Sequence, residues 1–335
     1  MTSEPKPAGA SGGQHADKPK SAVKFVTVTE KNELQRIDNF LVTQLKGLPK
    51  SKIYRIIRKG EVRINKKRCK PEAKLVIGDV VRIPPVFGLE EGVKSVYVSD
   101  SLSKVLDSAV LYEDASILVI NKPSGLAVHG GSGIQLGLIE ALRAKYPSHQ
   151  FLELVHRLDR DTSGCILIAK SRPALRALHA QFREDKVTKI YHLAVHGKWP
   201  KHLRKVDAPL KKNELKSGER IVTVSQEGKP SQTIFRILDT SEHFGLLEAK
   251  PVTGRTHQIR VHASFNGCPI VGDQKYIQDR VDDLHGQTKS RLMLHARAIQ
   301  FSLPSGEQKR IDAAYDSVYA NNLQKMGLKS DGSSR

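Results

Sequence analysis

The feature that most limits the fold is a succession of short apolar segments in the last two thirds of the chain. They span residues 117–120, 166–169, 191–195, 221–224, 233–238 and 246–249, and turn-forming residues separate them. Segments of this length are typical of β-strands. Two helices are expected among them, one capped by Ser171 and one beginning near Thr256. Because strands outnumber helices and short turns connect many of them, we predict an α+β fold with a large mixed, mainly antiparallel sheet.

A smaller domain is predicted before this region, over residues 34–97. Apolar residues repeat at helical spacing from Leu34 to Leu45, and a second helix follows with Pro49 in its first turn and Gly60 at its end. Its apolar stripe consists of Ile53, Ile56 and Ile57. A strand, a turn at residues 65–66 and a second strand at 80–83 complete a compact αα-β module.

The remaining segments set the expected boundaries. Residues 1–22 are rich in Pro, Gly, Ser and Lys without an apolar stretch, which predicts a disordered tail rather than a signal peptide, and hence a cytoplasmic protein. The stretch from Pro84 to Ser103 is interpreted as a linker. The large domain is expected over residues 104–325. Three widely spaced cysteines without a C-x-x-C pair indicate neither a disulfide framework nor a thiolate metal site.

Charge indicates a polyanionic partner. The chain has 55 Lys and Arg against 35 Asp and Glu, a formal net charge of +20. No apolar segment is long enough to span a bilayer, so nucleic acid is favoured over a membrane. The densest basic run lies in the small domain, where a solvated basic helix is the plainer alternative. We predict RNA contacts from Lys52, Arg55, Lys59, Arg63, Lys66, Lys67 and Arg68.

Residues 156–164 (HRLDRDTSG) place charged groups and a glycine immediately before an apolar strand. Asp159 stands between Arg157 and Arg160, and these cations would keep a partly buried carboxylate ionised, as a nucleophile requires. A surface salt-bridge loop is the structural alternative.

Residues 251–262 combine a glycine turn, a helix start and two arginines, Arg255 and Arg260, which suits phosphate binding. His257 and His262 are five residues apart, off the i, i+4 spacing of zinc ligands on a helix, so they are interpreted as hydrogen-bonding or packing residues. Residues 121–133 superficially suggest a phosphate loop but match neither glycine-rich nucleotide motif. No metal and no cofactor are expected.

These motifs together resemble the RluA family of pseudouridine synthases, from about residue 110 to 314. The resemblance rests on HRLD (156–159) with TSG (162–164), and on GRTHQIR (254–260). Supporting matches are NKPSG (121–125), KIY (189–191), PIVGD (269–273) and LMLHA (292–296). Residues 36–84 resemble an S4 domain, an RNA-binding module. Residues 217–222 and 225–230 are most similar to those family members that modify 23S ribosomal RNA.

The resemblance implies a set of roles. Asp159 would be the catalytic aspartate, Tyr191 the active-site tyrosine, and Arg255 the arginine that pairs with the aspartate. Arg157 and Arg260 are expected to contact RNA, and Leu294 to line a uracil pocket. The implied reaction isomerises uridine in 23S rRNA, free or in a large-subunit precursor, with a flipped base and a monomeric enzyme. Core packing for Tyr191 and a phosphate contact for Arg255 stay open as alternatives.

Two other functions are compatible with parts of the sequence. An RNA-binding assembly factor without catalysis would explain the charge but would leave the Asp159 and Arg255 motifs unused. An RNA N-glycosidase would break the same bond with carboxylate help but would need water delivered to the sugar.

Overall fold

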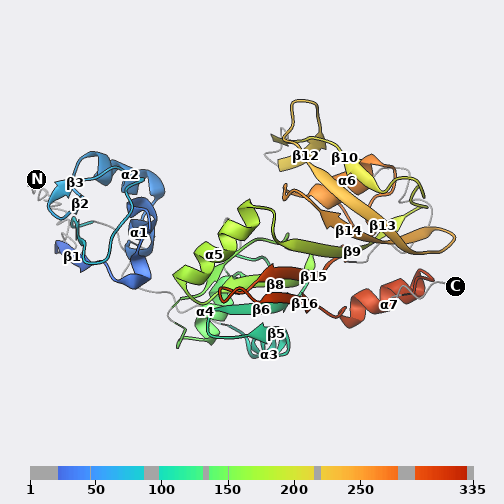
Figure 1. Ribbon diagram of the computed structural model, residues 1–335, viewed down its shortest axis with the longest axis horizontal. Helices are drawn as coiled ribbons and strands as arrows, with labels where there is room; N and C mark the ends of the chain where they lie inside the picture. The colour runs from blue at the N-terminus through green and yellow to red at the C-terminus, as the bar shows by residue number, and fades with distance from the viewer. Residues whose placement is uncertain are drawn as a thin grey trace, which may run out of the picture. The chain divides into compact units, whose positions relative to one another are not determined.

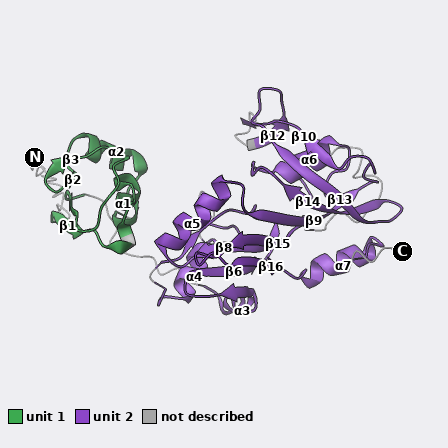
Figure 2. Cartoon of the chain, viewed as in Figure 1, with its two compact units in different colours: residues 1–93 green, residues 94–335 purple. Residues whose placement is uncertain are grey.

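The computed structural model describes residues 22–45, 47–86, 98–130, 136–149, 151–214, 220–277 and 291–329. The chain forms two compact units, residues 1–93 and 94–335 (Figure 2). The expected tail lies outside the described residues except for Ala22, as does most of the expected linker. Within the described residues, no helix has the length and apolarity needed to cross a membrane.

The first unit packs two helices against a small sheet (Figure 1). Its elements are β1 (Lys24–Thr27), η1 (Glu30–Asn32), α1 (Ile37–Gln44), α2 (Lys50–Arg58), β2 (Arg63–Ile64), β3 (Lys67–Arg68) and β4 (Val80–Ile83), with the strands in the order β1-β4-β2-β3. The isoleucine stripe of α2 is buried as expected. Gly60 follows the helix with φ +72°, a left-handed conformation that ends helices and that glycine adopts without strain. Strand β1 was not predicted.

The second unit is built on a sheet of ten strands, counted over the described residues (Figure 1). Eight follow the order β10-β13-β14-β9-β15-β8-β6-β5, while β16 pairs with β15 and β7 with β8. The bounds are β5 (Val110–Glu113), β6 (Ile117–Lys122), β7 (Glu153–Leu154), β8 (Ser163–Ala169), β9 (Thr188–His196), β10 (Lys205–Asp207), β13 (Gln232–Thr240), β14 (Phe244–Pro251), β15 (Leu294–Ser302) and β16 (Gln308–Asp312). Strands β11 (Leu210–Glu214) and β12 (Arg220–Val224) form a separate hairpin.

Helices cover the sheet on both faces. They are α3 (Asp100–Ser108), α4 (Leu138–Lys145), α5 (Arg172–Arg183), α6 (Gln258–Phe265) and α7 (Ser317–Lys325). Alternate residues of β6 and β8 face opposite sides, so that Leu118 packs with α3 and α4 while Val119 packs with α5. Ser171 caps α5 as predicted, because its hydroxyl accepts from the Ala174 amide. Helix α3 starts at Asp100, inside the expected linker, because Ser99 caps it.

All six predicted strands are present, and the α+β class with a mainly antiparallel sheet is confirmed. The parallel exception among the described pairings joins β8 to β15, where Ser163 faces His295 and Gly164 faces Ala296. Gly164 has φ +107°, and a Cβ there would lie 2.3 Å from the Ala296 carbonyl oxygen. Glycine is therefore required for the two backbones to approach this closely. The junction lies just after the loop that carries Asp159.

Candidate active site

Asp159 lies in the loop between β7 and β8, and a buried lysine, Lys122, holds this loop by a hydrogen bond to its backbone. Lys122, at the end of β6, is fully buried and its Nζ donates to the carbonyls of Pro123, Leu126 and Arg160 at 2.8–2.9 Å. Burial lowers the pKa of Lys122 to about 7. Three carbonyl acceptors match the three donors of an ammonium group. Residues 121–125 thus hold the Asp159 loop, rather than a phosphate.

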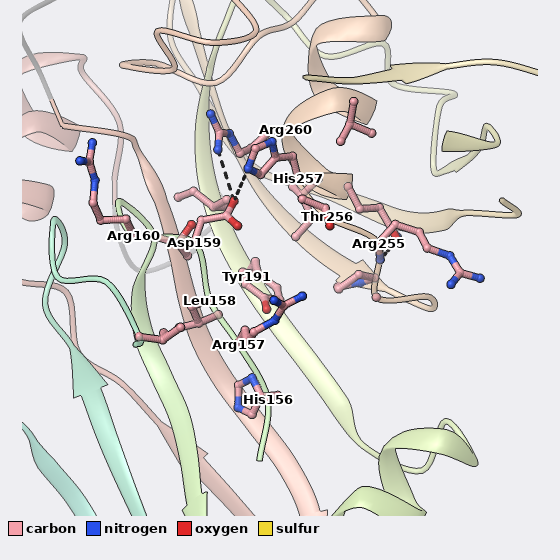
Figure 3. Close-up of a pocket in the computed structure, with 18 of the residues that line it drawn as sticks. His156, Arg157, Leu158, Asp159, Arg160, Tyr191, Arg255, Thr256, His257 and Arg260 are labelled. Carbon is pink, nitrogen blue, oxygen red and sulfur yellow. Dashed lines mark hydrogen bonds and ion pairs between the residues drawn. The ribbon is translucent and has the colours of Figure 1, made fainter. Parts of the chain in front are cut away.

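The carboxylate of Asp159 is half-buried and meets the guanidinium of Arg260. Arg260 Nη1 donates to Asp159 Oδ2 at 3.3 Å, and His257 Nε2 lies 3.8 Å from the same oxygen (Figure 3). The side chain of Arg260 is 11% exposed. Asp159 and Arg260 therefore form an ion pair at the wall of the pocket.

A second carboxylate aims Arg260. Asp273, whose side chain is fully buried, accepts from Arg260 Nε at 2.8 Å and from Arg260 Nη2 at 2.7 Å. Burial alone would lower the pKa of Arg260, but the hydrogen bonds and charge of Asp273, together with the charge of Asp159, raise it. Asp273 also accepts the backbone N–H groups of Lys275 and Tyr276. The guanidinium is therefore locked in one orientation, with Nη1 directed at Asp159.

The pairing predicted for Arg255 is wrong. Its side chain is exposed, its Nε donates to the carbonyl of Pro230 at 3.1 Å, and it points away from Asp159 (Figure 3). Arg255 stands in the turn before α6, whereas Arg260 lies in the first turn of the helix, on its buried side. The guanidinium of Arg260 is largely buried and held by Asp159 and Asp273, but it also lines the pocket, so its predicted RNA contact stays a prediction.

The countercharge of Asp159 comes from Arg260 rather than from the two arginines beside it in sequence. Arg160 is exposed and its Nε pairs with Asp161 Oδ1 at 3.0 Å, so it does not supply the countercharge of Asp159. Arg157 is exposed at the pocket, where it remains a predicted RNA contact.

Tyr191 on β9 lines the same pocket as Asp159, together with Leu294 at the start of β15. Burial, and then the charge of Asp159, raise the pKa of the Tyr191 hydroxyl. The side chain is half-buried and packs against apolar clusters on both sides of the sheet's centre. Tyr191 therefore both packs in the core and lines the pocket.

The pocket has a volume of about 970 Å³, enough for a nucleoside with room to spare. Its apolar lining includes Val128, Leu158 and Ile259. Several basic side chains contribute to the wall, namely Arg157, Arg160, Lys189, Lys212, Arg255, Arg260 and Lys275. A half-apolar, cationic pocket around one carboxylate suits a polyanionic substrate whose base enters the cavity.

The first unit presents a separate basic surface. Arg55, Lys59, Arg63 and residues 66–68 are exposed, and Lys52 is half-buried. Arg63 and Arg68 also donate to backbone carbonyls around Gly60, which holds their side chains near the turn after α2. These residues stay predicted RNA contacts.

Comparison with known proteins finds two family models. The RNA pseudouridylate synthase model matches residues 116–265, and the S4 domain model matches residues 35–81. The chain is 55% identical to the ribosomal large subunit pseudouridine synthase C of Escherichia coli K12, over 91% of this chain and 97% of that protein. It is 53% identical to the protein of the same name in Haemophilus influenzae, over 91% and 96%. Among solved structures, human RNA pseudouridylate synthase domain containing 4 is similar with a TM-score of 0.56 and 27% identity, over 68% of this chain and 97% of that one.

Proposed function

The chain belongs to the RNA pseudouridylate synthase family and is an isomerase, and we propose that it forms pseudouridine in the RNA of the large ribosomal subunit. The family predicted from its motifs is thereby confirmed. The named activity of its relatives and the S4 domain support this substrate. We propose that the substrate is 23S rRNA, either free or in a precursor particle, and that the enzyme modifies it in the cytoplasm as a monomer.

The reaction breaks the N1–C1′ bond of uridine and joins C5 to C1′. It involves no net oxidation or reduction, so the chemistry requires no redox cofactor. In the nucleophilic route, a carboxylate oxygen of Asp159 bonds to C1′ while the N1–C1′ electron pair leaves on the uracil. The uracil then turns, C5 attacks C1′, the carboxylate departs, and the C5 proton is lost to a base. In the elimination route, Asp159 instead removes the C2′ proton of the ribose, a C1′–C2′ double bond forms, and the N1–C1′ electron pair leaves on the uracil. C5 of the turned uracil then bonds to C1′, Asp159 returns the proton to C2′, and the C5 proton is lost to a base.

The surrounding side chains have defined tasks in either route. Arg260 pairs with the carboxylate of Asp159 and aims it. Tyr191 stacks on the uracil, and burial raises the pKa of its hydroxyl further above neutral pH, so that the group acts in its protonated form. Arg157 and Arg255 at the pocket contact phosphates. The target uridine must leave its stack, which costs a few kcal/mol that such contacts offset.

The observation that carries the proposal is the position of Asp159 in the pocket, 3.3 Å from the buried guanidinium of Arg260. The test is Asp159→Asn assayed by tritium release from unmodified large-subunit rRNA labelled at uridine C5. We expect Asp159→Asn to lose tritium release and to retain RNA binding. The matched control is Asp161→Asn, two residues away, which should retain tritium release. An Asp159→Asn protein with full activity would refute the assignment. Free uracil and a broken glycosidic bond in the product would instead indicate an N-glycosidase.

A further inference from the structure

Tyr276 contacts both groups that approach Asp159. It follows Asp273 after α6 and is 8% exposed. Its hydroxyl lies 2.6 Å from His257 Nδ1, and the guanidinium of Arg260 lies over its ring at 5.0 Å from the centroid. The rings of His257 and Tyr276 meet edge to face, with their centroids 5.5 Å apart. One side chain therefore supports both neighbours of the carboxylate.

The hydrogen bonds around Tyr276 fix the direction of its hydroxyl. The backbone N–H of Val222 on β12 donates to Tyr276 Oη at 3.1 Å. An amide N–H can only donate, so Tyr276 Oη is the acceptor in this hydrogen bond. Among the described residues, the acceptor within reach of the hydroxyl proton is His257 Nδ1. The imidazole then carries its own proton on Nε2, since a neutral histidine has one donor and one acceptor nitrogen. Burial lowers the pKa of His257, although Asp159 opposes this, so the neutral ring is favoured.

We infer that His257 is a positioning residue that presents Nε2–H to the carboxylate of Asp159, with its tautomer set by Tyr276. This inference rests on the proposed function of Asp159. His257 Nε2 and Arg260 Nη1 both approach Oδ2 of Asp159, at 3.8 Å and 3.3 Å. Both donors therefore hold the same oxygen, which leaves Oδ1 as the one to act on the sugar. The 3.8 Å separation from His257 is of the kind that shortens when a substrate closes the site.

The backbone of His257 supports a positioning role. The residue precedes α6 in the left-handed region, with φ 52° and ψ 20°. This conformation is unfavourable for a residue with a Cβ, and it persists where the surrounding structure imposes it. In this case it turns the imidazole back toward the Asp159 loop instead of along the helix (Figure 3).

Turnover of substituted proteins is the first arm of the test. Tyr276→Phe keeps the ring under Arg260 and removes only the hydroxyl, and we expect kcat to fall about tenfold while KM for rRNA is unchanged. His257→Asn, which cannot reach Asp159, should lower kcat by roughly tenfold to a hundredfold, and His257→Gln, which can place an amide N–H near Nε2, should restore part of it. The control is Tyr112→Phe, which removes a tyrosine hydroxyl that donates to Asp114 rather than to His257.

The second arm is nitrogen NMR of the histidine-labelled full chain, with the His257 signals identified by their loss in His257→Asn. We expect a neutral ring protonated at Nε2 in the wild type, and a mixture of tautomers in Tyr276→Phe. A wild-type ring protonated at Nδ1 or at both nitrogens would overturn the inference, as would unchanged kcat in both Tyr276→Phe and His257→Asn. If a variant does not fold, the wild-type tautomer decides alone. The NMR measurement of the tautomer does not depend on turnover. It therefore tests the role of His257 independently of the proposed function, which an active Asp159→Asn protein would refute.

Discussion

Breaking the ion pair of Arg260 and Asp273 by removing one partner should cost far more stability than breaking a pair on the surface, because it leaves a buried charge without its partner. We consider Asp273→Asn, Arg260→Gln and the double variant. Asp273→Asn keeps an oxygen for the amides of Lys275 and Tyr276 but leaves Arg260 buried beside a neutral group and an opposing N–H donor. Arg260→Gln leaves the fully buried carboxylate of Asp273 without its cation. Breaking a buried pair in this way costs about 3–5 kcal/mol.

The double variant separates the pair from its surroundings. Because Asp159 remains close to Arg260 in Asp273→Asn, that variant should lie near the lower limit, about 3 kcal/mol. The double variant should cost less than the sum of the two single changes, with a coupling free energy of about 2–3 kcal/mol. The exposed pair of Arg310 and Asp312, also bidentate, is the matched control and should couple by less than about 1 kcal/mol.

Urea unfolding measured by tryptophan fluorescence is the appropriate assay. The chain contains a single tryptophan, Trp199, which is buried in the core of the second unit, so its emission follows that unit alone. A coupling free energy equal to that of the surface pair would refute the view that Asp273 locks Arg260.

Two further predictions concern acid stability and RNA affinity. His295 is fully buried between Ser163 Oγ and the Ala313 carbonyl, and burial lowers its pKa to about 4. Below pH 6.5 the unfolded chain takes up a proton that the folded protein does not, so His295 should reduce the free energy of unfolding by up to about 1.4 kcal/mol per pH unit between pH 6.5 and 4. His295→Gln should remove that share of the slope in urea titrations, and an identical slope would contradict the assignment. Replacing Lys52, Arg55 and Lys59 by Gln should weaken rRNA binding and flatten its logarithmic salt dependence by roughly 0.7–0.9 per lost phosphate contact, and an unchanged salt slope would exclude this face.

Local patterns were sufficient to predict half of the sixteen described strands and the two amphipathic helices of the first unit. The predicted strand at 191–195 and the cap at Ser171 depend on residues close together in sequence, and the structure contains both. Strand β1 is short and largely exposed, so it carries little apolar signal. It is a strand because its backbone pairs with β4, which periodicity does not report.

The site was predictable in its motifs but not in its pairings. Arg255 and Arg260 share one motif, and the choice between them depends on which side of α6 faces Asp159, a matter of tertiary packing. Asp273 falls within a recognised motif, but its role follows only from the fold that brings it to Arg260. Lys122 gave no sign that it would be buried, since a lysine at the end of a strand is ordinarily solvated.

Strand β15 lies between β9 and β8, although it begins 106 residues after the start of β9 and 131 residues after the start of β8. Its contact partners Ser163 and His295 are 132 residues apart in sequence. On a translating ribosome, the two halves of the sheet leave the exit tunnel well before the strand that joins them. Their facing edges must await its insertion, because non-local pairing of this kind is slow. The pocket is complete only when this late strand is in place, because Leu294 at its start forms part of the lining.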